Sequence, residues 1–358
     1  MVKSGGDSTV TVLVAFGANL AVAAAKTFAA ALSGSASMSA EAAHSWADTG
    51  NEVFLLIANR RGGRKADERR PLGYGREAYV WSLLAAVGLF VVGAAVSIWR
   101  GVTELIHGEE GAEDYRLAYL VLAVAFVLEG ISWLQAVRQL RREAASFDSD
   151  VLEYALETSD PTVRAVFAED SAALIGIAIA FLGILLHELT GEVVWDAIGS
   201  ILVGVLLAVV AVILINRNRI FLTGEGGNPR IHEALVERLA RFPEVAEVRF
   251  LRSEFIGPKQ LFVIASVDLT GDAVESTIAK TLRTLEHRLE EDQYVAEAVL
   301  TVSEPDDVGI AFEVSTDPKT SESDKGPKGG EDVQSDPAKG AEDRTDWADE
   351  GGAPSDEE

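Results

Sequence analysis

The chain has 358 residues, of which 48% are apolar and 24% are charged, and its mean hydropathy is +0.16. Such a hydropathy is high for a soluble protein with this many charges, so the charges must be segregated from an apolar part that enters a membrane. The absence of cysteine excludes disulfides, thiolate metal sites and cysteine nucleophiles, and the net charge of -25 argues against a nucleic-acid partner.

Six stretches are candidates for membrane-spanning helices, because roughly 20 mainly apolar residues cross the hydrocarbon core of a bilayer. The predicted spans are 9–32, 37–59, 78–105, 115–138, 164–187 and 194–216. The second is the weakest of these predictions, because its first half, "SMSAEAAHSWADTGNE", is polar. The start "MVKSGGDSTV" lacks the regions of a cleaved signal peptide, so the first stretch is expected to be a retained helix.

The loops between these stretches alternate in charge. The loops after the second, fourth and sixth stretches contain the basic sequences "NRRGGRKADERR", "RQLRRE" and "NRNR". The loops after the third and fifth contain the acidic sequences "HGEEGAED" and "HELTGE". The positive-inside rule therefore predicts a multi-pass membrane protein with both termini in the cytoplasm, in the plasma membrane if the cell is prokaryotic.

The sequence divides into a six-helix transmembrane domain at 1–224, a soluble domain at 225–306 and a tail at 307–358. In the soluble part, the alternation in "VAEVRFLRSEFI", "QLFVIASVDL" and "VAEAVLTVSE" predicts three strands. Apolar residues at helical spacing in "RIHEALVERLARF" and "STIAKTLRTLEHRLEE" predict two helices. The order α-β-β-α-β predicts a ferredoxin-like α+β domain with both helices on one face of the sheet. The acidic tail has almost no apolar residues and is expected to be disordered.

Ionisable side chains lie inside the predicted spans, where each costs about 2.5 to 3.5 kcal/mol and is therefore a candidate functional group. His44 and Asp48 in the second span are four residues apart, which places them one turn apart on the same face of a helix. An imidazole nitrogen and a carboxylate in this position form half of a tetrahedral site for a divalent ion such as zinc. Asp170 in the fifth span offers a carboxylate for the other half.

Other polar side chains have ordinary structural interpretations. Glu41 and Glu52 are expected to face the headgroup region, to line a water-filled vestibule or to pack between helices. Asn19 is expected to pack against another helix, and Glu129 can bond to Ser or Asn of a neighbouring helix. The remaining histidines lie in loops or on soluble helices and are expected to be surface residues: His107, His187, His232 and His287.

The stretch "SGSASMSAEAAHSWADTGNEVFLL", followed by "RPLGYGREAYVW", resembles the cation diffusion facilitators, which are proton-coupled exporters of divalent transition metals. The resemblance covers 10–305 and includes the six spans, the basic loop after the second span and the α+β domain. The matching residues are Ser33, Gly34, Ser37, Ala40, Glu41, His44, Ser45, Ala47, Asp48, Gly73, Tyr74 and Gly75. The resemblance implies a secondary transporter and no enzyme. It would export zinc, with iron, cobalt or manganese as alternatives, in exchange for protons, and would form a homodimer through its cytoplasmic domain.

In that family, two pairs of ligands spaced four apart on the second and fifth spans hold the transported ion. The resemblance implies His44 and Asp48 as the first pair and Asp170 as one member of the second pair. The partner position is Val166, which cannot bind a metal. This departure from the family pattern leaves one ligand of the site to be supplied by another group.

Two acidic residues and a water molecule are the candidates for the missing ligand. Glu169 is only one residue from Asp170, about 100° of helix, so the two side chains cannot point equally well at one ion. Glu129 lies in "VLEGISW", which together with "FAEDSAAL" resembles a family branch with Glu in the fourth span and Glu-Asp in the fifth.

Two other classes of function stay open. A membrane metal sensor or scaffold would keep the spans but transport nothing, and a transporter of a different solute would use the buried polar groups differently. The soluble domain has no cysteine and offers only His232 and His287 with scattered acids, which gives little support to a regulatory metal site there.

Overall fold

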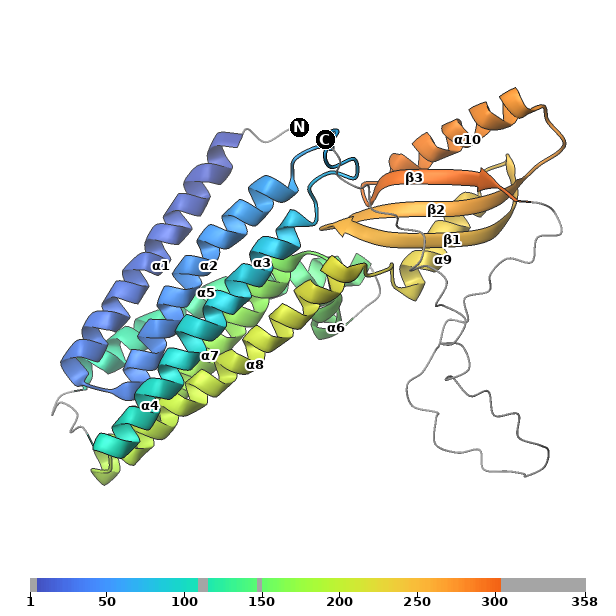
Figure 1. Cartoon of the computed structure of the whole chain (residues 1–358). Helices are drawn as coiled ribbons and strands as arrows, with labels where there is room; N and C mark the ends of the chain where they lie inside the picture. The colour runs from blue at the N-terminus through green and yellow to red at the C-terminus, as the bar shows by residue number, and fades with distance from the viewer. Residues whose placement is uncertain (1–4, 109–114, 147–149, 304–358) are drawn as a thin grey trace, which may run out of the picture. The chain divides into compact units, whose positions relative to one another are not determined.

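The computed structural model describes residues 5–108, 115–146 and 150–303. Most of the acidic loop after the third predicted span and the whole of the predicted tail lie outside these residues. The described chain forms a bundle of long helices and, after it in sequence, a small domain with a three-stranded sheet (Figure 1). The predicted fold class, a helical membrane protein with an α+β domain, is confirmed.

Six long helical segments make up the bundle. They are α1 (Gly5–Ser33), α2 (Ala36–Gly62), the continuous run of α3 (Glu77–Gly88), the π-helical segment η1 (Leu89–Ala95) and α4 (Val96–His107), then α5 (Arg116–Ser146), α7 (Pro161–Thr190) and α8 (Val194–Thr223). Each corresponds to one predicted span, and the fourth span was predicted to begin one residue before α5. The short helix α6 (Val151–Glu157), between α5 and α7, was not predicted, because its few residues carry no distinctive pattern.

Among the described helices, five segments are long and apolar enough to cross a membrane, and α2 is the segment that does not meet this condition. Its 27 residues are sufficient in length, but its first half is too polar. α2 packs against α1, α3, α7 and α8, so protein surrounds its polar side chains. The structure thus confirms that the second predicted span is a polar helix. That this helix crosses the membrane stays a prediction.

The outer surface of the bundle is apolar. Large hydrophobic side chains are exposed along its helices, and examples are Phe28, Trp99, Leu120, Phe126 and Val209. An apolar surface of this extent would be unfavourable in water, whereas lipid tails solvate it.

The interior of the bundle is built largely from small side chains. One core cluster between α2, α3, α7 and α8 contains Ala40, Ala47, Ala86, Ala165, Ala172 and Ala211. Small residues let helix backbones approach closely, which compensates for the weak hydrophobic driving force between helices in lipid.

The small domain consists of α9 (Pro229–Ala240), β1 (Val245–Gly257), β2 (Gln260–Leu269), α10 (Glu275–Glu290) and β3 (Val295–Val302). This is the predicted α-β-β-α-β order. The sheet order is β1-β2-β3, with β1 antiparallel and β3 parallel to β2. Leu239 of α9 and Leu289 of α10 pack into the same core as Val263 of β2, so one apolar face of the sheet carries both helices.

Aromatic residues of the bundle extend the core of the small domain. Tyr79 of α3 and Phe221 of α8 belong to the same buried cluster as the strands, and their rings stack with centroids 5.1 Å apart. The ring of Phe221 also meets that of Phe255 in β1 edge-on, with centroids 5.6 Å apart. Arg76 and Glu254 form an ion pair beside these rings. The division of the chain at 224 and 225 stays a prediction.

The loop between α2 and α3 lies close to the turn between β1 and β2. An ideal Cβ on Gly75 would be 2.4 Å from the carbonyl oxygen of Ile256 and 2.7 Å from Cα of Gly257. Because backbone atoms cannot yield as a flexible side chain does, Gly75→Ala should lower the free energy of unfolding by about 1 to 3 kcal/mol. Thermal unfolding of the detergent-purified protein measures this loss. The control is Gly17→Ala in α1, where no neighbouring atom lies within 4 Å; equal melting temperatures for both variants would contradict the close packing.

Candidate metal site between the helices

The start of α2 is held by a buried carboxylate of α8. Asp196 is fully buried and accepts a hydrogen bond from the hydroxyl of Ser35 at 2.9 Å. It also accepts from the backbone amides of Ala36 at 2.7 Å and Ser37 at 3.3 Å. These bonds satisfy donors that the first turn of a helix leaves unpaired, so they fix the start of α2 against α8.

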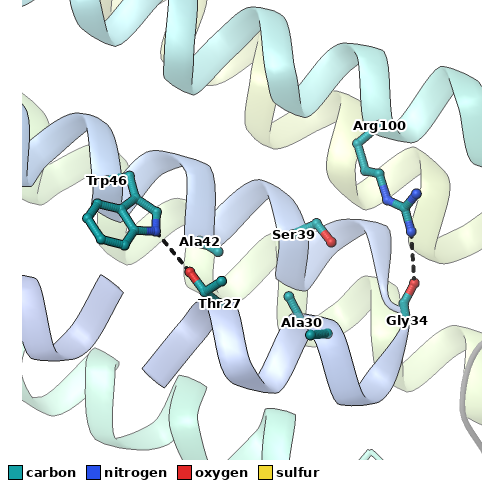
Figure 2. Close-up of a pocket in the computed structure, with 8 residues that line it drawn as sticks. Thr27, Ala30, Gly34, Ser39, Ala42, Trp46 and Arg100 are labelled. Carbon is teal, nitrogen blue, oxygen red and sulfur yellow. Dashed lines mark hydrogen bonds between the residues drawn. The ribbon is translucent and has the colours of Figure 1, made fainter. Parts of the chain in front are cut away.

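Two opposite faces of α2 have different surroundings. Ser39, Ala42 and Trp46 line a pocket of about 400 Å³ against α1, in which the Trp46 indole donates to the hydroxyl of Thr27 at 2.9 Å (Figure 2). The lining of this pocket contains no His, Asp or Glu, which are the ligands a metal would need in a protein without cysteine. His44 is two residues beyond Ala42, about 200° around the helix, and therefore faces the other way.

His44 and Asp48 lie on the same buried face of α2. The His44 side chain is fully buried, and its Nδ1 is 3.4 Å from Oδ1 of Asp48. In the described part of the chain, neither ring nitrogen of His44 has a hydrogen-bond partner, and Oδ1 of Asp48 has none either. Leaving buried polar atoms unpaired is costly, so their presence points to a ligand that they bind.

The two acidic residues of α7 point to different helices. Oε1 of Glu169 accepts from the side-chain amide of Asn51 on α2 at 2.9 Å. Oδ2 of Asp170 accepts from the hydroxyl of Ser132 on α5 at 2.7 Å. This divergence agrees with the 100° between successive helical residues. Val166, one turn before Asp170, packs among apolar side chains of the bundle.

The acids of α2, α5 and α7 lie near enough to act on one another electrostatically. Asp48 interacts with Glu169, Glu129 and Asp170. No three His, Asp or Glu side chains of residues 5–108, 115–146 and 150–303 converge closely enough to hold a metal ion. The structure thus gathers the predicted residues in one region without assembling a coordination shell.

Two further contacts join α1 to this region. The ammonium of Lys26 lies 2.9 Å from Oε2 of Glu41, and both side chains are fully buried. Asn19 donates to Glu52, which is the helix-packing role expected of it. Lys26 is not among the predicted residues, because a lone lysine in a long apolar stretch is commonly a residue that snorkels to the interface. Glu41 was the feature of the sequence that could have indicated Lys26, since a buried acid needs a buried partner of opposite charge.

Residues 12–219 match the family model for the cation efflux transmembrane domain. The match covers more than half of the chain and contains every helix of the candidate site. The chain belongs to the cation efflux family, the cation diffusion facilitators. This confirms the resemblance found in the sequence, and with the five apolar helices it identifies a multi-pass membrane protein.

Proteins of distant organisms are similar to this chain. It is 35% identical over 241 residues to Metal tolerance protein C4 of Arabidopsis thaliana, which is 67% of this chain and 52% of that protein. It is 34% identical over 241 residues to Proton-coupled zinc antiporter SLC30A9, mitochondrial, of Homo sapiens, which is 67% of this chain and 42% of that protein. The chain thus spans about half the length of these relatives. It is also 23% identical over 273 residues to Uncharacterized transporter MJ0449 of Methanocaldococcus jannaschii, which is 75% of this chain and 88% of that protein.

The hold of α8 on α2 can be tested with Asp196→Ala. This change removes the acceptor of three hydrogen bonds inside the bundle and should lower the free energy of unfolding by about 2 kcal/mol. Thermal unfolding in detergent measures the loss. Asp160→Ala is the matched control, because it removes a half-buried carboxylate that caps α7 by accepting from the amides of Thr162 and Val163. A loss for Asp196→Ala no larger than that of the control would show that this carboxylate does not secure α2.

Proposed function

We propose that this protein exports divalent transition-metal ions from the cytoplasm in exchange for protons. The observation that carries the proposal is the fully buried imidazole of His44, which lies beside Asp48 with both nitrogens unpartnered among the described residues. The names of two relatives, a metal tolerance protein and a proton-coupled zinc antiporter, support a metal cargo and a proton counter-ion. Zinc is the first candidate for the cargo, because the name of one relative specifies it. Iron, cobalt and manganese are alternatives, because imidazole and carboxylate ligands suit all four metals.

Competition between protons and metal for the same atoms would drive the exchange. His44 binds a metal only when its imidazole is neutral, and the carboxylates bind it only when they are ionised. A proton that arrives from the far side of the membrane therefore displaces the ion, provided that the site faces the two sides in turn. The process exchanges ligands without making or breaking covalent bonds, so the protein acts as a secondary transporter and not as an enzyme.

We assign His44 and three carboxylates to the metal site, with Glu169 and Glu129 as the alternatives for the third carboxylate. Asp48 completes the half-site on α2, and Asp170 supplies the main ligand from α7. Because the described acids do not converge on one point, loading requires their side chains to turn toward His44. The hydrogen bonds of Asp170 with Ser132 and of Glu169 with Asn51 each use one carboxylate oxygen and leave the other for the metal. Glu169 or Glu129 then takes the place that Val166 leaves without a ligand.

We place both termini and the small domain on the cytoplasmic side, and we propose that two copies of the chain pair through the small domain. The basic residues support this orientation, because they gather where α2, α5 and α8 end, and Arg60 and Arg61 occupy the last turn of α2. The homodimer is implied by the family resemblance.

The role of the α2 half-site can be tested in reconstituted vesicles. His44→Ala and Asp48→Ala should each abolish metal-dependent proton flux, because each removes a ligand from the site. Parallel metal-sensitive and pH-sensitive dyes, used with zinc, iron, cobalt and manganese, measure cargo and counter-ion together. His107→Ala and Asp272→Ala change exposed residues of the same types and should transport normally.

The outcomes of this assay separate the alternatives. Undiminished flux in both α2 variants would contradict the assigned site. A wild-type protein that binds metal but moves none would instead be a sensor or scaffold, and proton flux that no metal affects would indicate a different solute.

The second half-site can be dissected by isothermal titration calorimetry of the purified protein with zinc. Asp170→Asn should weaken zinc binding by at least about 100-fold, because the loss of even a residue that only orients a metal ligand costs about 10- to 100-fold in affinity. Glu169→Gln should weaken binding more than Glu129→Gln, because Glu169 already contacts α2 through Asn51. The reverse order would assign the missing ligand to Glu129, and wild-type affinity in Asp170→Asn would remove α7 from the site.

A further inference from the structure

A buried ion pair lies beside the candidate metal site. The ammonium of Lys26 on α1 and the carboxylate of Glu41 on α2 are 2.9 Å apart, and neither side chain is exposed. Removing two charges from water is costly, and their attraction only partly offsets this cost. Two apolar side chains would join α1 and α2 without that penalty, so the pair calls for an explanation other than stability.

The surroundings of Glu41 hold its carboxylate in one position. Oε2 contacts Lys26, and Oε1 lies against α7 without a hydrogen-bond partner among the described residues. An ideal Cβ on Gly176 of α7 would be 2.5 Å from this Oε1, so the glycine leaves the space that the carboxylate occupies. Glu41 is therefore enclosed by three helices.

Glu41 shares a helix face with the proposed ligands. It precedes His44 by three residues, and Asp48 follows His44 by four, so the three side chains are stacked along one side of α2. Without a partner, Glu41 would be a further carboxylate able to bind a cation in this position. The charge of Lys26 also acts on Asp48, His44 and Glu129.

We propose that Lys26 sets the metal affinity of the transport site. Its ammonium occupies Glu41 as a tethered competing cation and places a positive charge near the bound metal. Both effects weaken metal binding, which lets an ion surrounded by several carboxylates leave again. This role rests on the proposed function, and it makes Lys26 a positioning and affinity-setting residue that does not touch the metal.

The test measures zinc affinity by calorimetry on the purified full-length chain carrying Lys26→Gln, Glu41→Gln or both changes. Lys26→Gln can still donate a hydrogen bond to Glu41 but lacks the charge, so zinc should bind about tenfold more tightly. Glu41→Gln leaves the Lys26 charge uncompensated, and zinc should bind about tenfold more weakly. The double variant has the same net charge as the wild-type protein, so its zinc affinity should be close to the wild-type value.

A role in packing alone predicts a different pattern, because both single variants would then lose affinity. The proposal would be overturned if the zinc affinities of Lys26→Gln and Glu41→Gln changed in the same direction, or if neither changed. In vesicles, Lys26→Gln should lower both KM and kcat for zinc, because tighter binding slows release. Lys26→Arg keeps the charge and should stay near the wild-type affinity, and Lys26→Met provides a second uncharged variant if Lys26→Gln does not fold.

Failure of this inference is distinguishable from failure of the proposed function. If the wild-type protein binds zinc and moves it in vesicles and His44→Ala does neither, the proposed function stands whatever the Lys26 variants show. If the wild-type protein binds no metal, the proposed function fails, and the inference fails with it.

Discussion

The cost of burying charged side chains among apolar helices constrains the whole bundle. A polar group inside the membrane must find its partner in protein, since lipid offers none. α2 carries several of these groups, among them Glu41, His44 and Asn51, and is enclosed by helices that are themselves apolar enough to span a bilayer. The contacts of Lys26 with Glu41 and of Asn51 with Glu169 follow from this requirement, because each pairs a polar side chain of one helix with that of another.

The buried atoms of His44 and Asp48 that lack a hydrogen-bond partner support a metal site on α2. Neither ring nitrogen of His44 nor Oδ1 of Asp48 has a hydrogen-bond partner among the described residues, although Glu41 and Asn51 of the same helix bond to side chains of neighbouring helices. Asp196 fixes the start of the same helix against α8, so the backbone that carries His44 and Asp48 is held in place. A transport site needs this combination, because ligands must be held in place and still be free to exchange protons for metal.

The bundle and the small domain share part of a hydrophobic core through Tyr79 and Phe221. The rings of Tyr79 and Phe221, whose centroids are 5.1 Å apart, cannot shift independently, because a close-packed core transmits displacement. If α3 or α8 rearranges in the proposed transport, Phe255 of the sheet must therefore shift as well. This coupling depends on aromatic contacts between segments far apart in sequence.

Composition and periodicity determined the positions of the six helical segments, the unusual polarity of α2 and the α-β-β-α-β order, because these are local properties of the chain. The spacing of His44 and Asp48 likewise determined that they share one helix face, since four residues make about one helical turn. Only the tertiary structure decided that Lys26 pairs with Glu41, and that Glu169 meets α2 whereas Asp170 meets α5. Those contacts depend on how helices pack side by side, and neither helical spacing nor composition encodes which distant side chains will meet.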